Sequence, residues 1–247
     1  SGLPYIRDML DAPCSAAHGN RRPQRVDLNL DPLPYSELQH LRHPALCTYH
    51  VFQEAYEPAQ YALLHPVGAK ADYAARLTCH DQAIEAGLQE IGLGILLGAG
   101  AYTFDLVALI AHARHLVETY GVGPHTLSFP RMVPAAGAPV SQEPQRQVSD
   151  EDFVFITAVA RLARPHTGLI LSTPAKSETR RELYSTGISE VMVGASSYPG
   201  VYTEDGDPEG AGRLVIGRPR PLEAVIYRMC EYGFLPNLCT SCYAKRR

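Results

Sequence analysis

Apolar residues along this chain follow two spacings that alternate. Short apolar runs predict six β-strands, over Arg25–Leu30, Cys47–Gln53, Ile91–Leu97, His125–Pro130, Thr167–Ser172 and Ser189–Val193. Between most of these runs, apolar residues recur every three or four positions, which is the spacing of one face of a helix. Strands that alternate with helices predict an α/β fold with one parallel sheet of about six strands.

The helical segments carry recognisable end signals. The clearest predicted helix covers Thr103–Tyr120, with Thr103 as its N-cap and Gly121 at its end. Ser149 precedes another helix, and Asp152 three residues later gives a pattern close to a capping box. The remaining predicted helices are Asp72–Glu85, Ser149–Ala163, Glu178–Ser185 and Leu222–Tyr232, with Leu3–Asp11 as a further candidate.

The same pattern predicts one domain followed by a short tail. Residues 1–233 hold all the predicted strands and helices, and residues 234–247 form the tail. Residues 132–148 and 196–220 are rich in proline, glycine or alanine and are predicted to be long loops. Long loops of α/β folds that follow the carboxyl ends of strands often build functional sites.

Composition narrows the class of protein. The 247 residues are 45% hydrophobic and 19% charged, as in soluble globular proteins, and the net charge of −4 argues against a nucleic-acid-binding surface. Apolar runs fall short of the ~20 residues that span a bilayer, and the first residues do not resemble a signal peptide. Six scattered cysteines do not suit a disulfide scaffold, so we expect a reducing, cytoplasmic location.

The sharpest local motif is the pair Cys239-Thr-Ser-Cys242 in the tail. Two thiolates at this spacing can bind one metal ion or cluster, because a tight turn aims both sulfurs at one point. The pair could instead be redox-active or have no chemical role. The other four cysteines are interpreted as small buried hydrophobic residues.

Residues at the ends of predicted strands are further candidates. Glu54 follows the second strand, where a carboxylate would reach the carboxyl edge of the sheet. Gly92, Gly94 and Gly98 cluster in and after the third strand, where glycine can admit a ligand or simply form a tight turn. His125 stands at the start of the fourth strand and could ligate a metal or only cap the strand.

Several longer segments resemble the HydG family of radical SAM tyrosine lyases. The matching segments include YHVFQEAY at 49–56, HPVG at 65–68, YGVGPHT at 120–126, SFPR at 128–131 and LCTSCY at 238–243. They occur in the order of the family from about Arg25 to Arg246, roughly nine-tenths of the chain. The related tyrosine lyase of thiamine biosynthesis shares the barrel segments but lacks the terminal cysteine pair, so that pair favours the branch that matures [FeFe]-hydrogenase.

The resemblance implies a partial (β/α) barrel of the TIM type. It implies that S-adenosylmethionine (SAM), a radical [4Fe–4S] cluster and tyrosine meet at the carboxyl ends of the strands, and that tyrosine is cleaved to p-cresol and dehydroglycine. It further implies that CO and cyanide form on an auxiliary, C-terminal [4Fe–4S] cluster that carries an extra iron. Hydrogenase-maturation proteins would then be the partners.

The same resemblance assigns roles to individual residues. Cys239 and Cys242 would ligate the auxiliary cluster, and His125 would help to hold the extra iron. Glu54, Gly92, Gly94 and Gly98 would line the SAM or substrate site, and Ser172 and Thr173 would contact the substrate.

Departures from the family pattern lead to competing hypotheses. The sequence contains no Cx3Cx2C loop for the radical cluster, six predicted strands replace the eight of a closed barrel, and Pro174 stands where the family usually has arginine. We therefore expect a fragment that is inactive alone, whose sheet edges are covered by a missing N-terminal segment or another subunit. The alternatives are a diverged, non-catalytic iron–sulfur scaffold and a tyrosine lyase of the 2-iminoacetate synthase type.

Overall fold

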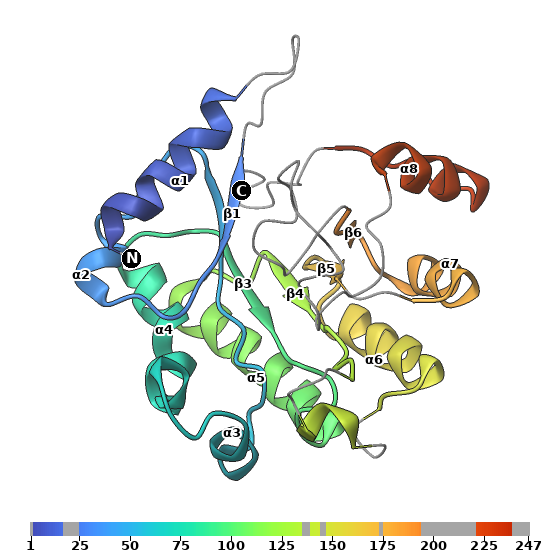
Figure 1. Cartoon of the computed structure of the whole chain (residues 1–247), viewed down its shortest axis with the longest axis horizontal. Helices are drawn as coiled ribbons and strands as arrows, with labels where there is room; N and C mark the ends of the chain where they lie inside the picture. The colour runs from blue at the N-terminus through green and yellow to red at the C-terminus, as the bar shows by residue number, and fades with distance from the viewer. Residues whose placement is uncertain are drawn as a thin grey trace.

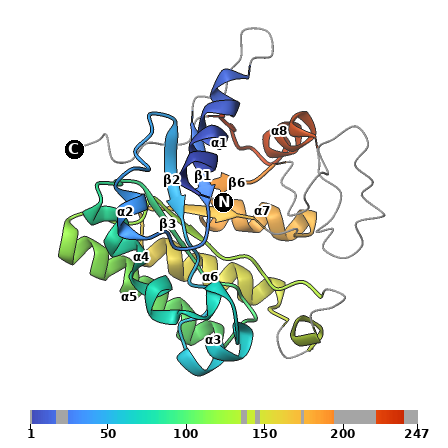
Figure 2. The same ribbon diagram turned by 60° about the vertical axis from the view of Figure 1, so that its left-hand side comes forward.

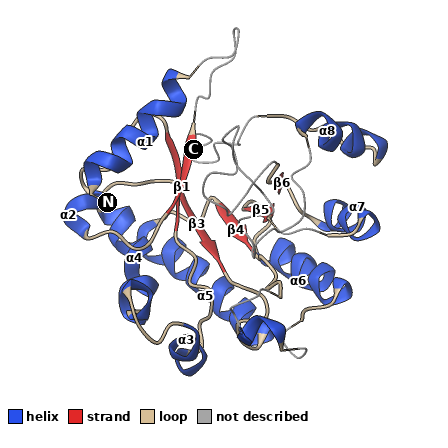
Figure 3. Cartoon of the chain, viewed as in Figure 1, coloured by secondary structure: helices blue, strands red, loops and turns tan. Residues whose placement is uncertain are grey.

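The computed structural model describes residues 2–16, 25–134, 139–143, 147–172, 175–193 and 221–238. One parallel sheet runs through this part of the chain, with its strands in the order of the sequence. The strands are β1 (Val26–Asn29), β2 (Leu46–His50), β3 (Ile91–Gly94), β4 (Thr126–Ser128), β5 (Gly168–Leu171) and β6 (Glu190–Val191). Helices surround the curved sheet in an arc on its outer side (Figure 1; in Figure 3 the strands are red and the helices blue). The predicted partial (β/α) barrel is confirmed.

The helices alternate with the strands as the sequence pattern predicts. They are α1 (Leu3–Ser15), α2 (Tyr35–Leu38), α3 (Pro58–Leu64), α4 (Tyr73–Glu85), α5 (Tyr102–Tyr120), α6 (Asp150–Ala163), α7 (Ser177–Thr186) and α8 (Leu222–Glu231), with 3-10 turns η1 (Ala69–Ala71) and η2 (Pro139–Gln142). Helices α2 and α3 were not predicted, because each is too short to show a helical repeat. The η2 turn lies inside one predicted loop, and residues 196–220 of the other lie outside the described residues.

Two of the three predicted helix ends are confirmed. Ser149 caps α6, because its hydroxyl accepts a hydrogen bond from the Asp152 amide at 3.0 Å. Gly121 ends α5 in the left-handed conformation with a φ of 70°. The prediction of Thr103 as an N-cap is wrong, because α5 begins at Tyr102 and Thr103 is already helical. The Tyr102 hydroxyl donates a hydrogen bond to Asp152 of α6 at 2.8 Å.

The two faces of the sheet have different chemistry. The outer face packs apolar side chains against the helices in one continuous core, including Tyr49, Ile91, Leu93, Leu127 and Leu169. The inner face carries His50, Phe52, Thr126, Ser128 and Glu190, which alternate with the outward-facing residues of their strands. Figure 2 shows the strands beside the helical layer from a second direction. Barrel interiors are usually filled by bulky aliphatic residues, so this polar inner face is unusual.

Cysteine burial agrees only in part with the sequence interpretation. Cys47 and Cys79 are buried, as expected of small hydrophobic residues. Cys230 is exposed. Helix α8 packs on the rest of the molecule through Met229 and through Tyr232, which follows the helix, and this packing leaves Cys230 facing outward. Among the described residues, no helix combines the length and apolarity needed to cross a membrane.

Candidate functional site

Glu54 lies at the carboxyl edge of the sheet, as the sequence predicts. After β2 the chain continues to Glu54, which forms a parallel bridge with Ile95 just beyond β3. Its φ of 68° lies in the left-handed region that favours glycine. A non-glycine residue in that conformation costs about 1–3 kcal/mol, and such strain is typical of functional positions.

The Glu54 carboxylate holds a cluster of basic side chains. Its Oε1 accepts hydrogen bonds from Lys70 Nζ at 2.7 Å and from an Arg76 guanidinium nitrogen at 3.3 Å, and its Oε2 lies 3.0 Å from His65 Nε2. Arg76 is buried and also donates to Phe52 O at 2.7 Å and to Asp31 at 3.1 Å. Burial lowers the pKa of His65, which favours the neutral imidazole.

Lys70 differs from Arg76 in having exposed charge. Its side chain is 44% exposed, compared with 5% for Arg76, so the Lys70 ammonium reaches the surface at this edge. Sequence reasoning selected Glu54 but missed both cations. The helical position of Arg76 and the loop position of Lys70 gave no sign that they would meet the end of β2.

The three glycines occupy two different environments. A Cβ added to Gly92 would collide with the His50 ring, and one added to Gly94 would collide with the Phe52 ring. These two glycines therefore let side chains of β2 lie across the inner face of β3. Gly98 lies beyond β3 at the carboxyl edge with a φ of 100°, where the chain turns toward α5.

Ser172 lies at the same edge as Glu54, but on a more distant strand. Its Oγ is 3.3 Å from the Oγ of Ser128, at the ends of β5 and β4. Strands β3 and β4 separate it from β2, so the two predicted residues share an edge without forming a described contact. Thr173 and Pro174 lie outside the described residues.

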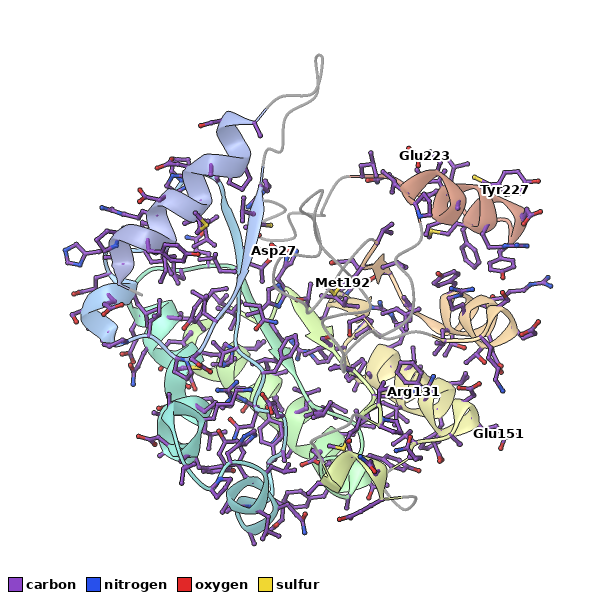
Figure 4. All side chains as sticks on the ribbon, in the orientation of Figure 1. Asp27, Arg131, Glu151, Met192, Glu223 and Tyr227 are labelled. Atoms are coloured by element: carbon purple, nitrogen blue, oxygen red, sulfur yellow. The ribbon has the colours of Figure 1, made fainter. Side chains whose placement is uncertain are left out.

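Arg131 is a further basic residue at the carboxyl edge, following β4. It donates to Asp150 Oδ1 at 2.6 Å, and its guanidinium lies 4.8 Å from the centre of the Phe153 ring. Figure 4 labels it beside α6. This pairing lowers the pKa of Asp150 and fixes the loop after β4 to α6.

His125 lies at the opposite end of the sheet. Its backbone amide donates to Ile91 O at 2.8 Å, and its carbonyl accepts from the Gly168 amide at 2.9 Å. Because the strands are parallel, this amino edge is remote from the edge that carries Glu54. The His125 ring is buried, which lowers its pKa and favours a neutral imidazole.

Two residues that sequence reasoning did not select lie beside His125. The Cys47 thiol donates to Glu90 Oε2 at 3.1 Å, and Arg25 donates to both oxygens of Glu90 at 3.2 and 3.3 Å. Cys47, Glu90 and His125 each offer one possible metal-ligand atom, and these three atoms lie within 4.8 Å of one another. The sequence offered one sign of this cluster, because Cys47, Glu90 and His125 all stand at or next to the starts of neighbouring strands.

The inner face between the two edges shifts the pKa of its ionisable groups. Burial and the nearby Asp27 raise the pKa of Glu190 to about 7. Burial lowers the pKa of His50 to about 4, although its Nε2 lies 4.0 Å from Asp27 Oδ2. Figure 4 labels Asp27 on β1. Near neutral pH, His50 is therefore uncharged and Glu190 is partly protonated.

The predicted metal ligands of the terminal pair, Cys239 and Cys242, lie outside the described residues. Of the predicted site residues, the structure places Glu54, Gly98 and Ser172 at the carboxyl edge and His125 at the amino edge.

Comparison with known sequences identifies related enzymes. Residues 128–235 match the family model of the Biotin and Thiamin Synthesis associated domain. The chain is 30% identical over 212 residues to 2-iminoacetate synthase of Escherichia coli K12, covering 85% of this chain and 55% of that protein. It is 28% identical over 181 residues to the Salmonella typhimurium protein of the same name, covering 73% and 47%.

Solved structures give a closely matching fold. A crystal structure of HydG, a maturase of the [FeFe]-hydrogenase, matches with a TM-score of 0.86 and 37% identity, covering 98% of this chain and 51% of that chain. HydG from Carboxydothermus hydrogenoformans matches with a TM-score of 0.87 and 34% identity, covering 99% and 54%. Methylornithine synthase, 18% identical with a TM-score of 0.64, shares the fold. The chain spans about half the length of these relatives.

Proposed function

The chain belongs to the radical SAM tyrosine lyase family, with the 2-iminoacetate synthases and the HydG maturases, and from this premise we propose that it supplies half of the barrel of a HydG-like enzyme. The complete enzyme would cleave tyrosine to p-cresol and dehydroglycine and form CO and cyanide on an auxiliary iron–sulfur cluster. It would act in the cytoplasm together with other hydrogenase-maturation proteins.

The observation that carries the proposal is the ion-paired cluster at the carboxyl edge. SAM and tyrosine both carry an α-carboxylate and an α-ammonium group. Lys70 offers an exposed cation and Glu54 a carboxylate, 2.7 Å apart, and such a pair can complement both groups of an amino acid. Gly98 and Ser172 lie at the same edge, where (β/α) barrels place their active sites. Gly92 and Gly94, also predicted to bind cofactor, lie lower and shape the inner face beneath this site.

The radical cluster does not fit the residues of this chain. Cys47, Cys79 and Cys230, the cysteines whose side chains are described, belong to β2, α4 and α8. The sequence contains no Cx3Cx2C loop. The homologues imply SAM and a [4Fe–4S] cluster, which together supply a carbon radical. This chain would contribute groups that bind SAM and tyrosine.

An auxiliary site at the other end of the sheet is the second part of the proposal. Cys239 and Cys242 would ligate an auxiliary [4Fe–4S] cluster, and His125 would hold its extra iron. The position of His125 at the amino edge supports a second site remote from tyrosine cleavage. Anaerobic reconstitution of the 247-residue chain with iron and sulfide should give one cluster or less. Cys239→Ala with Cys242→Ala should remove it, whereas Cys230→Ala should not. Unchanged iron in the double variant would contradict this assignment.

A non-catalytic scaffold remains the second candidate function. It is favoured by Pro174, which replaces the arginine that the family resemblance places after the Ser-Thr pair. Proline has no charge with which to bind the carboxylate of tyrosine.

The test of catalysis uses the polypeptide encoded by the natural reading frame that contains this sequence. In an anaerobic assay with reductant, SAM and tyrosine, we expect 5′-deoxyadenosine and p-cresol. Glu54→Gln should lower kcat/KM about tenfold, the equivalent of one charge-assisted hydrogen bond of about 1.4 kcal/mol. Glu57→Gln, which changes a half-buried carboxylate that caps α3, is the matched control and should leave the rate within twofold.

The outcomes separate the candidate functions. Formation of 5′-deoxyadenosine without p-cresol would show a radical SAM enzyme with a substrate other than tyrosine. Formation of neither product would contradict the enzyme proposal and favour the scaffold.

A further inference from the structure

Three potential metal ligands meet at the amino edge of the sheet. Cys47 belongs to the start of β2, Glu90 immediately precedes β3, and His125 immediately precedes β4. These strands are neighbours, and the amino ends of neighbouring parallel strands lie side by side. Three segments far apart in the sequence thus bring a thiol, a carboxylate and an imidazole together.

The geometry of the three side chains suits a single ion. Their ligand atoms all lie within 4.8 Å of one another, and Cys47 Sγ lies 3.1 Å from Glu90 Oε2. Cys47 and His125 are buried, and Glu90 is partly buried. An ion placed between them would be largely removed from solvent.

We propose that Cys47, Glu90 and His125 form a binding site for one divalent transition metal ion, of the series from iron to zinc. Mixed sulfur, nitrogen and oxygen ligands suit these ions, whereas magnesium and calcium require oxygen ligands. Three protein ligands would leave a fourth position open, as in catalytic rather than structural sites. On metal binding the Cys47 thiol loses its proton to solvent, and the metal replaces that proton between Sγ and the Glu90 carboxylate.

Arg25 supports the site from outside the ligand set. It donates to both oxygens of Glu90, which fixes the orientation of the carboxylate beside the thiol. Groups that hydrogen-bond to metal ligands in this way typically change metal affinity by 10–100-fold. Arg25 is therefore a positioning residue rather than a ligand.

This inference shares His125 with the proposed auxiliary iron and so deepens that proposal by naming two further ligands. It needs neither the terminal cysteine pair nor tyrosine cleavage. The alternative is that Cys47, Glu90 and Arg25 form a hydrogen-bonded network that binds no ion.

The test is a titration with Co²⁺, whose bond to a thiolate gives a charge-transfer absorption band. The full chain with Cys239→Ser and Cys242→Ser is used anaerobically, so that the terminal pair cannot contribute. We expect one equivalent of Co²⁺ and a thiolate charge-transfer band. Adding Cys47→Ser should abolish the band, whereas Cys79→Ser, which changes another buried thiol, should leave it intact.

Variants of the other two ligands give independent readouts. Glu90→Gln and His125→Gln should each weaken Co²⁺ binding at least tenfold. Arg25→Ala keeps all three ligands and should retain the band with weaker affinity. Thermal melting of each variant establishes that the chain is folded.

Several results would overturn the proposed site. A chain without the terminal pair that shows no charge-transfer band would do so, as would a band that persists in Cys47→Ser. Failure of the proposed function is distinguishable, because cluster reconstitution on Cys239 and Cys242 is measured separately in the chain that retains them.

Discussion

At the scale of single residues, the inner face of the sheet sets the charge of Glu190. Its Oε1 is buried and receives no hydrogen bond among the described residues, and its neighbours are Asp27, Gly168 and Thr126. Losing a proton there leaves a charge in a poorly solvated place close to another carboxylate. Its pKa is therefore raised to about 7.

This raised pKa predicts a specific dependence of stability on pH. Between about pH 4.5 and 7 the folded chain keeps a proton on Glu190 that the unfolded chain loses, so its contribution to stability falls as pH rises. Glu190→Gln should match the natural chain near pH 4.5 and exceed it by about 3 kcal/mol above pH 7, since a difference of one in pKa corresponds to about 1.4 kcal/mol. Urea unfolding across this pH range measures the difference. Glu151→Gln, exposed on α6 (Figure 4), is the control variant, and a flat difference for Glu190→Gln would contradict the assignment.

Sequence reasoning reached some site residues and not others, for a physical reason. Glu54 and His125 stand at the two ends of apolar runs, so their edges of the sheet could be predicted from a one-dimensional pattern. Lys70 and Arg76 meet Glu54 only because the loop and helix after β2 fold back on it. Cys47 reads as an ordinary buried residue until Glu90, 43 residues later, is placed beside it. Contacts of that kind depend on register between strands, which a single sequence does not reveal.

At the scale of elements, helix ends differ in how well local chemistry specifies them. Ser149 both accepts from the Asp152 amide and donates to the Asp152 carboxylate, so the start of α6 is encoded within four residues. The start of α5 has no side-chain cap, since Ala101 precedes it, and its first residue Tyr102 makes a tertiary contact, the hydrogen bond to Asp152. Local patterns therefore predicted the first cap correctly and placed the second two residues late, because Ala101 rather than Thr103 precedes the helix.

The cap of α6 allows a direct measurement. Ser149→Ala should lower the free energy of unfolding by about 1 kcal/mol, because it leaves an amide of the first helical turn without its partner. Ser185→Ala removes an exposed hydroxyl whose described hydrogen bond goes to the Arg181 carbonyl of α7, and it should change stability by less than about 0.5 kcal/mol. Denaturant unfolding of both variants compares them. Equal losses would show that the Ser149 hydroxyl does not act as a cap.

At the scale of the whole molecule, the sheet has two edges. Each of β1 and β6 pairs with one neighbour in the described part of the chain, and together they leave the half-barrel unclosed. Unpaired backbone groups at such edges readily bind another strand. A parallel sheet of six strands was predicted from the sequence pattern, whereas closure depends on what covers these edges.

The edge at β6 predicts self-association of the isolated chain. Met192 follows β6, is 54% exposed, and its amide continues the ladder by donating to Leu171 O. In analytical ultracentrifugation we expect concentration-dependent species larger than the monomer. Met192→Lys should weaken this association about tenfold, because lysine opposes edge pairing. Leu162→Lys replaces a more exposed apolar residue on α6, away from the edge, and should leave association unchanged. A chain that stays monomeric at all concentrations would contradict an open edge.

The strand order also bears on how the chain acquires its structure during synthesis. Each strand from β2 onward pairs with the strand translated just before it, from β1 through β6. A strand leaving the ribosome therefore finds its partner already made, separated from it only by the helical segment that connects the two strands. Pairing of consecutive strands keeps each contact shorter in sequence than a pairing between distant strands would be, and folding is faster when contacts are more local. The half-barrel can thus grow one strand and one helix at a time, in the direction of translation.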